Sequence, residues 1–262
     1  MTRAPTPRWA RRAGIAWTVA LGLGLAAPVG LTALVALAGT AGAGAPDSLL
    51  ALWSASLWRS AQVVGVVVPL ALLIGGPAAW SFRRHPFPGS RLLEAAVLVP
   101  LAVPGVALAF GLLLSAGALP RFWLLAAAHL AYTVPLVVTM VGNAVDRLDP
   151  RLEAAARSLG AGRGEALRAV VLPLLAPAVA LSSLLVFAVS WGELNASFFL
   201  STPLVRTFPA ALYTTYGTSS FPVAAAATLV CLLPVVPAML AIQALGGEDL
   251  HPFHAFHRGL QP

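Results

Sequence analysis

The side chains that could do chemistry in this sequence are few, and the most unusual is Glu193, a carboxylate within the long apolar stretch 174–200. An ionisable group at membrane depth faces the protein interior or a water-filled cavity, and it commonly marks the path of a solute. Other polar side chains occur in the same stretch and in the one before it. We therefore predict one polar cavity, part of a translocation path, lined by Glu193, Asn195, Ser190, His129 and Tyr132.

A structural role for Glu193 fits the sequence equally well. Arg59, Arg121 and Arg206 are expected near the outer surface of the membrane, as Glu193 is. One of them could therefore pair with the carboxylate across a helix bundle. A lone histidine such as His129 is more often a hydrogen-bonded residue of the bundle than a ligand. Both roles stay open on the sequence alone.

Catalytic chemistry finds little support. The sequence has no lysine, so a G-x-x-x-x-G-K-[ST] phosphate loop and Schiff-base chemistry are excluded. No paired acids or nucleophile with its base stand out. Cys231 is the only cysteine, and His251, His254 and His257 fall in what we expect to be a solvated tail. We predict that the chain is not an enzyme and that it holds no metal and no cofactor.

Membrane helices must position these residues. The sequence is 59% hydrophobic and 10% charged, and a spanning helix needs about 20 apolar residues. Six stretches qualify, which predicts an all-α membrane protein with a single transmembrane domain over 14–245. The predicted spans are 14–38, 57–80, 92–115, 122–143, 174–200 and 222–245.

Arginine placement predicts the orientation of the spans. Thirteen of the sixteen arginines fall in the tail 1–13, the second connection, the connection 143–173 and the tail 246–262. Basic residues accumulate on the cytoplasmic side, so we expect both termini and the 143–173 loop there. The first stretch exceeds the ~7–15 apolar residues of a signal peptide, which favours a retained helix. The net charge of +7 then implies contact with membrane lipid and no nucleic acid.

The connection 143–173 carries the signals of a helical hairpin. Asp149 can cap a helix, Pro150 suits its first position, and Glu153 falls in its first turn. Gly160 can end that helix in a left-handed conformation, and a second helix is predicted from 164 to 172 before Pro173 restarts the chain. The apolar stripe of Leu152, Ala155, Ala156 and Leu159 could lie on lipid headgroups or dock in a groove of another protein.

The segment Glu153-Ala-Ala-Ala-Arg-Ser-Leu-Gly160 resembles the EAA loop of permease subunits of ABC importers. Ala154 stands at the position of the family's glutamate, with Glu153 one residue before it. Pro100-Leu-Ala-Val-Pro-Gly105 and Ser190-Trp-Gly-Glu-Leu-Asn195 are also similar to this family. The resemblance assigns coupling to an ATPase to Asp149, Glu153, Ala155, Ala156, Leu159, Gly160, Val170, Leu172 and Pro173.

This resemblance implies a bundle like that of type I ABC importer permeases, in a bacterial inner membrane. The chain would form half of the path for a small solute, of the iron(III), thiamine, polyamine or phosphonate kind. Its expected partners are a cytoplasmic ABC ATPase dimer that uses the ATP, a second permease copy or homologue, and an extracytoplasmic solute-binding protein. An ion-coupled secondary transporter is the alternative, although that class usually carries several ionisable groups at mid-membrane.

Overall fold

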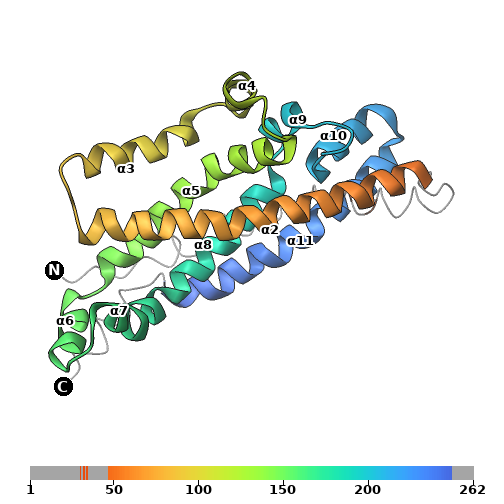
Figure 1. Cartoon of the computed structure of the whole chain (residues 1–262). Helices are drawn as coiled ribbons and strands as arrows, with labels where there is room; N and C mark the ends of the chain where they lie inside the picture. The colour runs from red at the N-terminus through yellow and green to blue at the C-terminus, as the bar shows by residue number, and fades with distance from the viewer. Residues whose placement is uncertain (1–29, 31, 33, 35–46, 250–262) are drawn as a thin grey trace, which may run out of the picture.

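The computed structural model describes residues 30, 32, 34 and 47–249, and this part of the chain is an assembly of helices (Figure 1). It contains no strand, only an isolated bridge between Thr202 and Val205. The predicted all-α fold class is confirmed. In chain order the elements are α2 (Asp47–Arg84), α3 (Ser90–Leu98), the 3₁₀ segment η1 (Val99–Ala102), α4 (Gly105–Ala116), α5 (Arg121–Arg147), α6 (Pro150–Ser158), α7 (Arg163–Ala166), the π-helical segment η2 (Leu167–Val171), α8 (Leu172–Gly192), α9 (Asn195–Leu200), α10 (Phe208–Thr218) and α11 (Phe221–Asp249).

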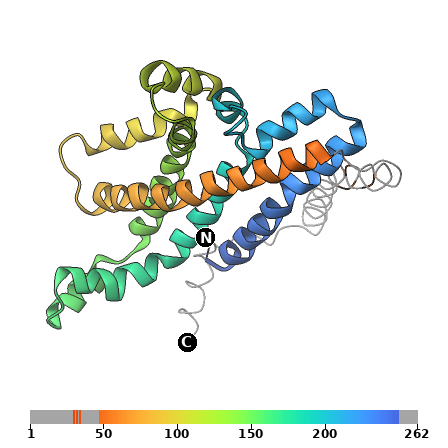
Figure 2. The same ribbon diagram turned by 45° about the vertical axis from the view of Figure 1, so that its right-hand side comes forward.

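Helices α2 and α5 share the most extensive packing in the described bundle. Valines such as Val63, Val67, Val137 and Val141 form their common core. Gly75 lets the two helices approach closely, because a Cβ atom there would lie 2.8 Å from the Cβ of Val137. Helix α8 packs against both, and α11 packs on α8 (Figures 1 and 2).

Four single helices are long and apolar enough to cross a membrane, over residues 50–84, 121–147, 163–192 and 221–242. A bent pair, 90–102 with 105–116, could make a fifth crossing. The predicted first span, 14–38, lies outside the described residues apart from three helical positions, and so do the tail 1–13 and residues 250–262 of the second tail.

The bend in that pair has a local cause in the sequence. Pro104 disfavours helical backbone at the residue before it, and Val103 is accordingly extended, with φ −84° and ψ 126°. The two halves meet at an angle of 108°. The predicted third span, 92–115, is thus interrupted by a sharp break between η1 and α4.

The fifth predicted span, 174–200, also differs from a single helix. Helix α8 ends at Gly192, Glu193 is extended with ψ 119°, and α9 begins at Asn195. No proline causes this break. The next subsection shows that the Glu193 side chain itself stabilises the start of α9.

Candidate functional site

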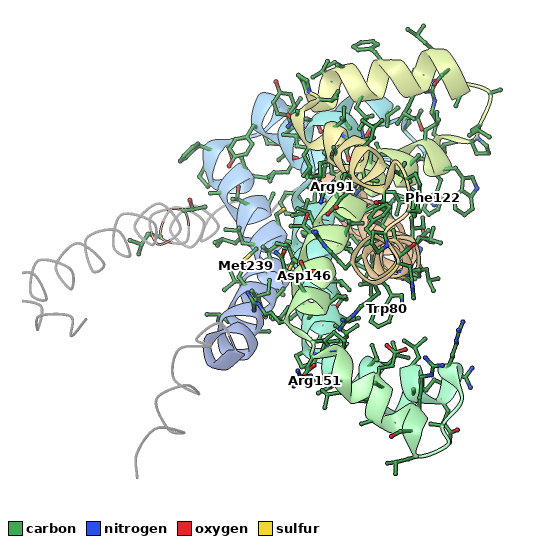
Figure 3. All side chains as sticks on the ribbon, turned by 90° about the vertical axis from the view of Figure 1, so that its left-hand side faces the viewer. Trp80, Arg91, Phe122, Asp146, Arg151 and Met239 are labelled. Atoms are coloured by element: carbon green, nitrogen blue, oxygen red, sulfur yellow. The ribbon has the colours of Figure 1, made fainter. Side chains whose placement is uncertain are left out.

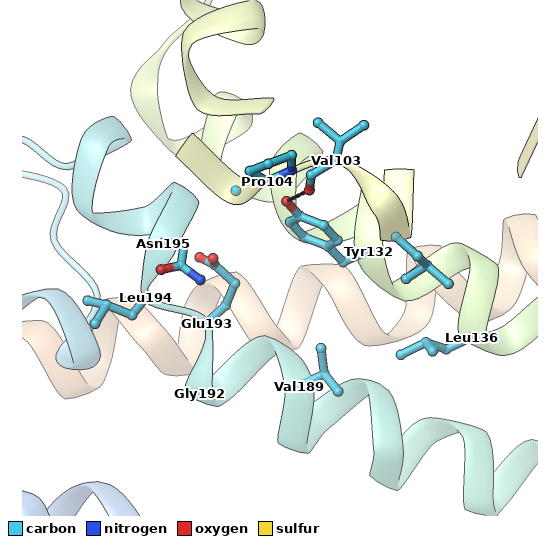
Figure 4. A pocket seen from close by; sticks show the side chains of 11 residues that line it. Val103, Pro104, Tyr132, Leu136, Val189, Gly192, Glu193, Leu194 and Asn195 are labelled. Carbon is cyan, nitrogen blue, oxygen red and sulfur yellow. Dashed lines mark hydrogen bonds between the residues drawn. The ribbon is translucent and has the colours of Figure 1, made fainter. Parts of the chain in front are cut away.

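An open pocket with a volume of about 710 Å³ lies where the two broken helices meet. Figure 4 shows Glu193 and Asn195 on one side of it and Pro104 and Tyr132 on the other. Residues of η1, α4 and α5 contribute to the apolar part of its walls. The lining residues are Leu101, Val103, Pro104, Gly105, Tyr132, Leu136, Val189, Gly192, Glu193, Leu194 and Asn195.

The carboxylate of Glu193 is engaged by the first turn of α9. Its Oε1 accepts a hydrogen bond from the Ala196 amide at 2.8 Å. Its Oε2 accepts from the Ser197 amide at 2.9 Å and from the Ser197 hydroxyl at 2.7 Å. Glu193 therefore satisfies backbone donors that would otherwise lack partners at a helix start.

His129 joins the two halves of the broken helix from behind the pocket. Its ring is buried, with Nδ1 2.7 Å from the Ser190 hydroxyl on α8 and Nε2 2.9 Å from the Ser197 hydroxyl on α9. Nε2 also lies 3.7 Å from Glu193 Oε2. The imidazole thus connects α5 to both sides of the break, and its two nitrogens have partners.

The opposite wall of the pocket is held by Tyr132 and by a close backbone approach. The Tyr132 hydroxyl donates to the Val103 carbonyl at 3.0 Å, at the bend between η1 and α4 (Figure 4). A Cβ atom on Gly105 would lie 2.6 Å from Asn195 Cβ and 3.1 Å from the Ala196 nitrogen. Only glycine therefore lets the start of α4 contact the start of α9 without a shift.

The structure thus brings together part of the predicted path. Glu193, Asn195 and Tyr132 line the pocket, whereas His129 and Ser190 are buried beside it. The apolar walls from Leu101, Val103 and Leu136 were not predicted. Their only sequence signal was the Pro-x-x-x-Pro-Gly pattern ending at Gly105.

The predicted arginine partners of Glu193 lie elsewhere. Within the described residues no arginine is within ion-pair distance of this carboxylate. Arg59 instead donates to Gln62 Oε1 at 2.9 Å and to the Leu204 carbonyl at 3.3 Å. The structural alternative for Glu193 therefore takes a different form, a helix cap rather than an ion pair.

The second candidate site is the hairpin of α6 and α7, which projects beyond the ends of α2 and α5 (Figures 1 and 2). Figure 3 shows it below the bundle, with Arg151 near its start. The Asp149 side chain accepts from the Arg151 amide at 2.9 Å, Pro150 is the first helical residue, and Glu153 is in the first turn. These features agree with the local signals in the sequence.

The turn of the hairpin is a complete Schellman motif around Gly160. Gly160 has φ +97° and donates its amide to the Arg157 carbonyl at 3.0 Å, while the Ala161 amide donates to the Ala156 carbonyl at 3.2 Å. No residue of α6 is buried. Leu159 is 89% exposed and Leu152 47% exposed, so the described part of the chain leaves these two large apolar side chains uncovered.

The second arm of the hairpin differs from the predicted separate helix. Helix α7 continues through η2 into α8 with no break at Pro173, which lies in the first turn of α8. A proline within a helix crowds the carbonyl four residues earlier, and a π turn is a common way to relieve such crowding. Val171 is buried, Val170 is partly covered and Leu172 is exposed. The arm and the start of the predicted fifth span form one helical run, 163–192.

Comparison with known proteins identifies similar chains. A family described as "Binding-protein-dependent transport system inner membrane component" matches residues 67–246. The molybdenum transport system permease protein ModB of Escherichia coli K12 is 32% identical over 211 residues, covering 72% of this chain and 90% of that protein. The spermidine/putrescine transport system permease protein PotC of Haemophilus influenzae is 28% identical over 187 residues, covering 70% and 73%.

Solved structures show the same fold at low identity. An importer of the acidic polysaccharide alginate contains a chain with a TM-score of 0.68 and 19% identity, covering 92% of this chain and 99% of that one. The MetNI methionine ABC transporter, in an inward-facing conformation, gives a TM-score of 0.62 at 16% identity, covering 77% and 99%.

Proposed function

The chain belongs to the family of inner membrane components of binding-protein-dependent transport systems, and from this premise we propose that it forms half of a solute path moved by its α6–α7 hairpin. It is a multi-pass permease subunit of an ABC importer in the inner membrane and not an enzyme, because ATP is hydrolysed by a separate subunit of such systems. Both termini and the hairpin are proposed to face the cytoplasm, following the arginine distribution.

The exposed hairpin is the observation that carries the proposal. Leu152 and Leu159 project from an arm with no buried residue, and apolar side chains presented by a short helix suit a groove on another protein. The other arm is continuous with α8. A partner that binds the hairpin can therefore displace α8, which lines the pocket. The proposed partner is a cytoplasmic ATPase dimer, with Asp149, Gly160 and Pro173 shaping the docking element.

A cysteine crosslink tests this docking. Cys231 is the only native thiol, so Cys231→Ala gives a background for single cysteines. Leu159→Cys in the purified complex should crosslink to the ATPase subunit through a short bifunctional maleimide. The control is Leu204→Cys, which is 84% exposed between α9 and α10, against 89% for Leu159. Crosslinks from both positions, or from neither, would contradict the assigned role of the hairpin.

Glu193, Asn195 and Tyr132 are proposed to face the translocating solute, with His129 and Ser190 supporting the wall behind them. The pocket presents one carboxylate, an amide and a phenol, and none of the described residues that line it is basic. This composition favours a cationic solute of the polyamine kind over phosphonate or an oxyanion. The relatives named for molybdenum and for spermidine/putrescine span both chemistries.

The solute is best tested on the solute-binding protein that is proposed to work with this chain. Isothermal titration with spermidine, thiamine, iron(III) citrate, a phosphonate and molybdate should give saturable binding for a cationic or amine solute. Molybdate binding alone would overturn the proposed substrate class. Uptake into vesicles then separates the importer from an ion-coupled transporter, because vanadate should stop the importer whereas an ionophore should not.

A further inference from the structure

The last turn of α2 carries two neighbouring arginines that reach different parts of the fold. Arg83 Nη2 lies 2.6 Å from Glu94 Oε1 on α3, and Arg83 Nε lies 3.4 Å from Asp146 Oδ2 on α5. All three side chains are partly exposed, so the charges themselves add little stability in water. One planar guanidinium shared by two carboxylates nevertheless fixes the relative position of three helices.

Arg84 reaches the base of the hairpin. Its Nη2 donates to the Leu148 carbonyl at 2.7 Å, and its guanidinium carbon lies 5.6 Å from the centre of the Trp80 ring. Leu148 directly precedes Asp149, the residue that caps α6. The end of α2 is therefore bonded to the segment from which the hairpin starts.

Helix α3 has few other restraints. Ser90 is its only buried residue, and Leu92 is 76% exposed. The chain enters α3 from α2 through a short turn in which Gly89 has φ +90°. This turn anchors only the start of α3. The Arg83–Glu94 pair links its second turn to α2, and α3 also packs against α5.

The far end of α3 leads to the pocket. It continues through η1 to Val103 and Pro104, both of which line the cavity. The Tyr132 hydroxyl on α5 donates to the Val103 carbonyl, so this end of the segment is held against α5 at the pocket. A rotation of α3 about its anchored start would consequently move one wall of the pocket.

We propose that Arg83 and Arg84 are positioning residues that join the hairpin to α3, so that displacement of the hairpin turns α3 and reshapes the pocket. The inference rests on the proposed docking of the hairpin. Its route runs from Asp149 and Leu148 to Arg84, through the backbone of α2 to Arg83, and from Arg83 to Glu94. Such a chain of polar contacts between rigid helices can carry energetic coupling when the helices have two arrangements.

Spin-label distances in the complex with the ATPase test the proposed link between the hairpin and α3, and they need no knowledge of the solute. Labels at Leu92→Cys on α3 and Leu233→Cys on α11, both exposed, are introduced with Cys231→Ala. The distance is measured without nucleotide and with ATP plus vanadate. We expect a shift in the parent complex, and its loss in Arg83→Gln and in Arg84→Gln. Arg59→Gln is the matched control, because this arginine makes two hydrogen bonds in the N-terminal half of α2, far from Arg83 and Arg84 in the sequence.

The Leu159→Cys crosslink is run in every variant to separate the two proposals. If the parent does not crosslink to the ATPase, the proposed docking fails. If the crosslink forms but the distance shift is absent in the parent, or persists in Arg83→Gln and Arg84→Gln, the proposed link through Arg83 and Arg84 is refuted. The proposed docking of the hairpin then still stands. Arg83→Lys, which keeps the charge without the planar fork, serves if Arg83→Gln does not assemble. It should retain only part of the shift, and a full shift would overturn the inference.

Discussion

At the scale of single residues, Glu193 shows how a carboxylate in an apolar stretch finds hydrogen-bond partners without an arginine. Its two oxygens accept three hydrogen bonds from Ala196 and Ser197, and the His129 ring lies 3.7 Å away. A carboxylate is the natural acceptor for the unpaired amides at a helix start. The same group that lines the pocket therefore also holds α9 in place, so a substitution at Glu193 tests both roles.

Replacement of Glu193 by glutamine should loosen α9 before it alters any solute contact. Glutamine keeps one acceptor oxygen but loses the charge and one acceptor, and a lost helix cap costs about 1 kcal/mol. Hydrogen exchange of the Ala196 and Ser197 amides should accelerate by roughly fivefold, which is that energy expressed as a rate ratio. Asn195→Ala is the control, because the exposed Asn195 side chain is not the hydrogen-bond acceptor of these amides, which is Glu193. Equal exchange in Glu193→Gln and the parent would show that the cap is unimportant.

Gly160 and Gly162 form a matched pair that isolates backbone conformation. A Cβ atom would meet nothing within 4 Å at either position, but Gly160 has φ +97° and Gly162 has φ −66°. A β-branched residue at Gly160 costs at least about 1–2 kcal/mol of backbone strain, and it misdirects the hairpin. We expect Gly160→Val to insert normally but to abolish ATPase copurification and uptake, whereas Gly162→Val retains both. Equal behaviour of the two variants would contradict a left-handed requirement.

At the scale of elements, the pocket depends on two helix breaks that face each other. The start of α4 contacts the start of α9 through Gly105, whose Cβ position is only 2.6 Å from Asn195 Cβ. The Tyr132 hydroxyl and the Glu193 carboxylate stabilise the two breaks from α5 and from the α9 turn. The two breaks contact each other at Gly105 and Asn195, so we expect a change in one to affect the other.

Gly105→Ala should therefore destabilise the protein, while Gly111→Ala in the same helix should not. The added methyl at Gly105 meets the side chain and backbone of α9, and overpacking of this kind costs about 1–3 kcal/mol. At Gly111 a Cβ atom has nothing within 4 Å, and alanine is favoured over glycine in a helix by about 0.5–1 kcal/mol. Thermal unfolding midpoints in detergent should shift in opposite directions. A lower midpoint for both would refute the specific contact.

The elements that the sequence predicted well are those with local causes. Asp149, Pro150 and Gly160 define the hairpin because capping, proline geometry and a left-handed glycine act within a few residues. The break at Glu193 was not predicted, because it depends on a side chain folding back onto α9 and on the approach of Gly105 from another helix. The π turn before Pro173 was also not predicted. A proline in a long apolar run is equally compatible with the start of a new helix and with a continuous helix that contains a π turn.

The same distinction applies to the candidate site. Glu193, Asn195 and Tyr132 were predicted from their polarity within apolar stretches, and they share the pocket. His129 has the same polarity but is buried between two serine hydroxyls. Which face of a helix turns toward a cavity is decided by packing with other helices, and sequence polarity alone does not specify it.

At the scale of the whole molecule, the described chain leaves its pocket open and large apolar surfaces uncovered. Leu92 on α3 and Leu114 on α4 are 76% and 89% exposed. Lipid can cover such side chains in a membrane, but an aqueous path needs a protein wall on every side. Among the described residues, its walls come from η1, α4, α5, α8, α9 and the two helix breaks. A second permease chain is the proposed occupant of the open side.

The composition of the purified complex tests this requirement directly. Native mass spectrometry of the complex isolated through this subunit should show two permease chains with two ATPase chains. A homodimer would contain two membrane chains of 26.9 kDa, and a heterodimer would contain one such chain and a homologue of another mass. A photoreactive benzoylphenylalanine at Asn195, which lines the open pocket, should crosslink to that second chain. A complex with a single permease chain, together with adducts to lipid alone, would contradict the proposed second chain.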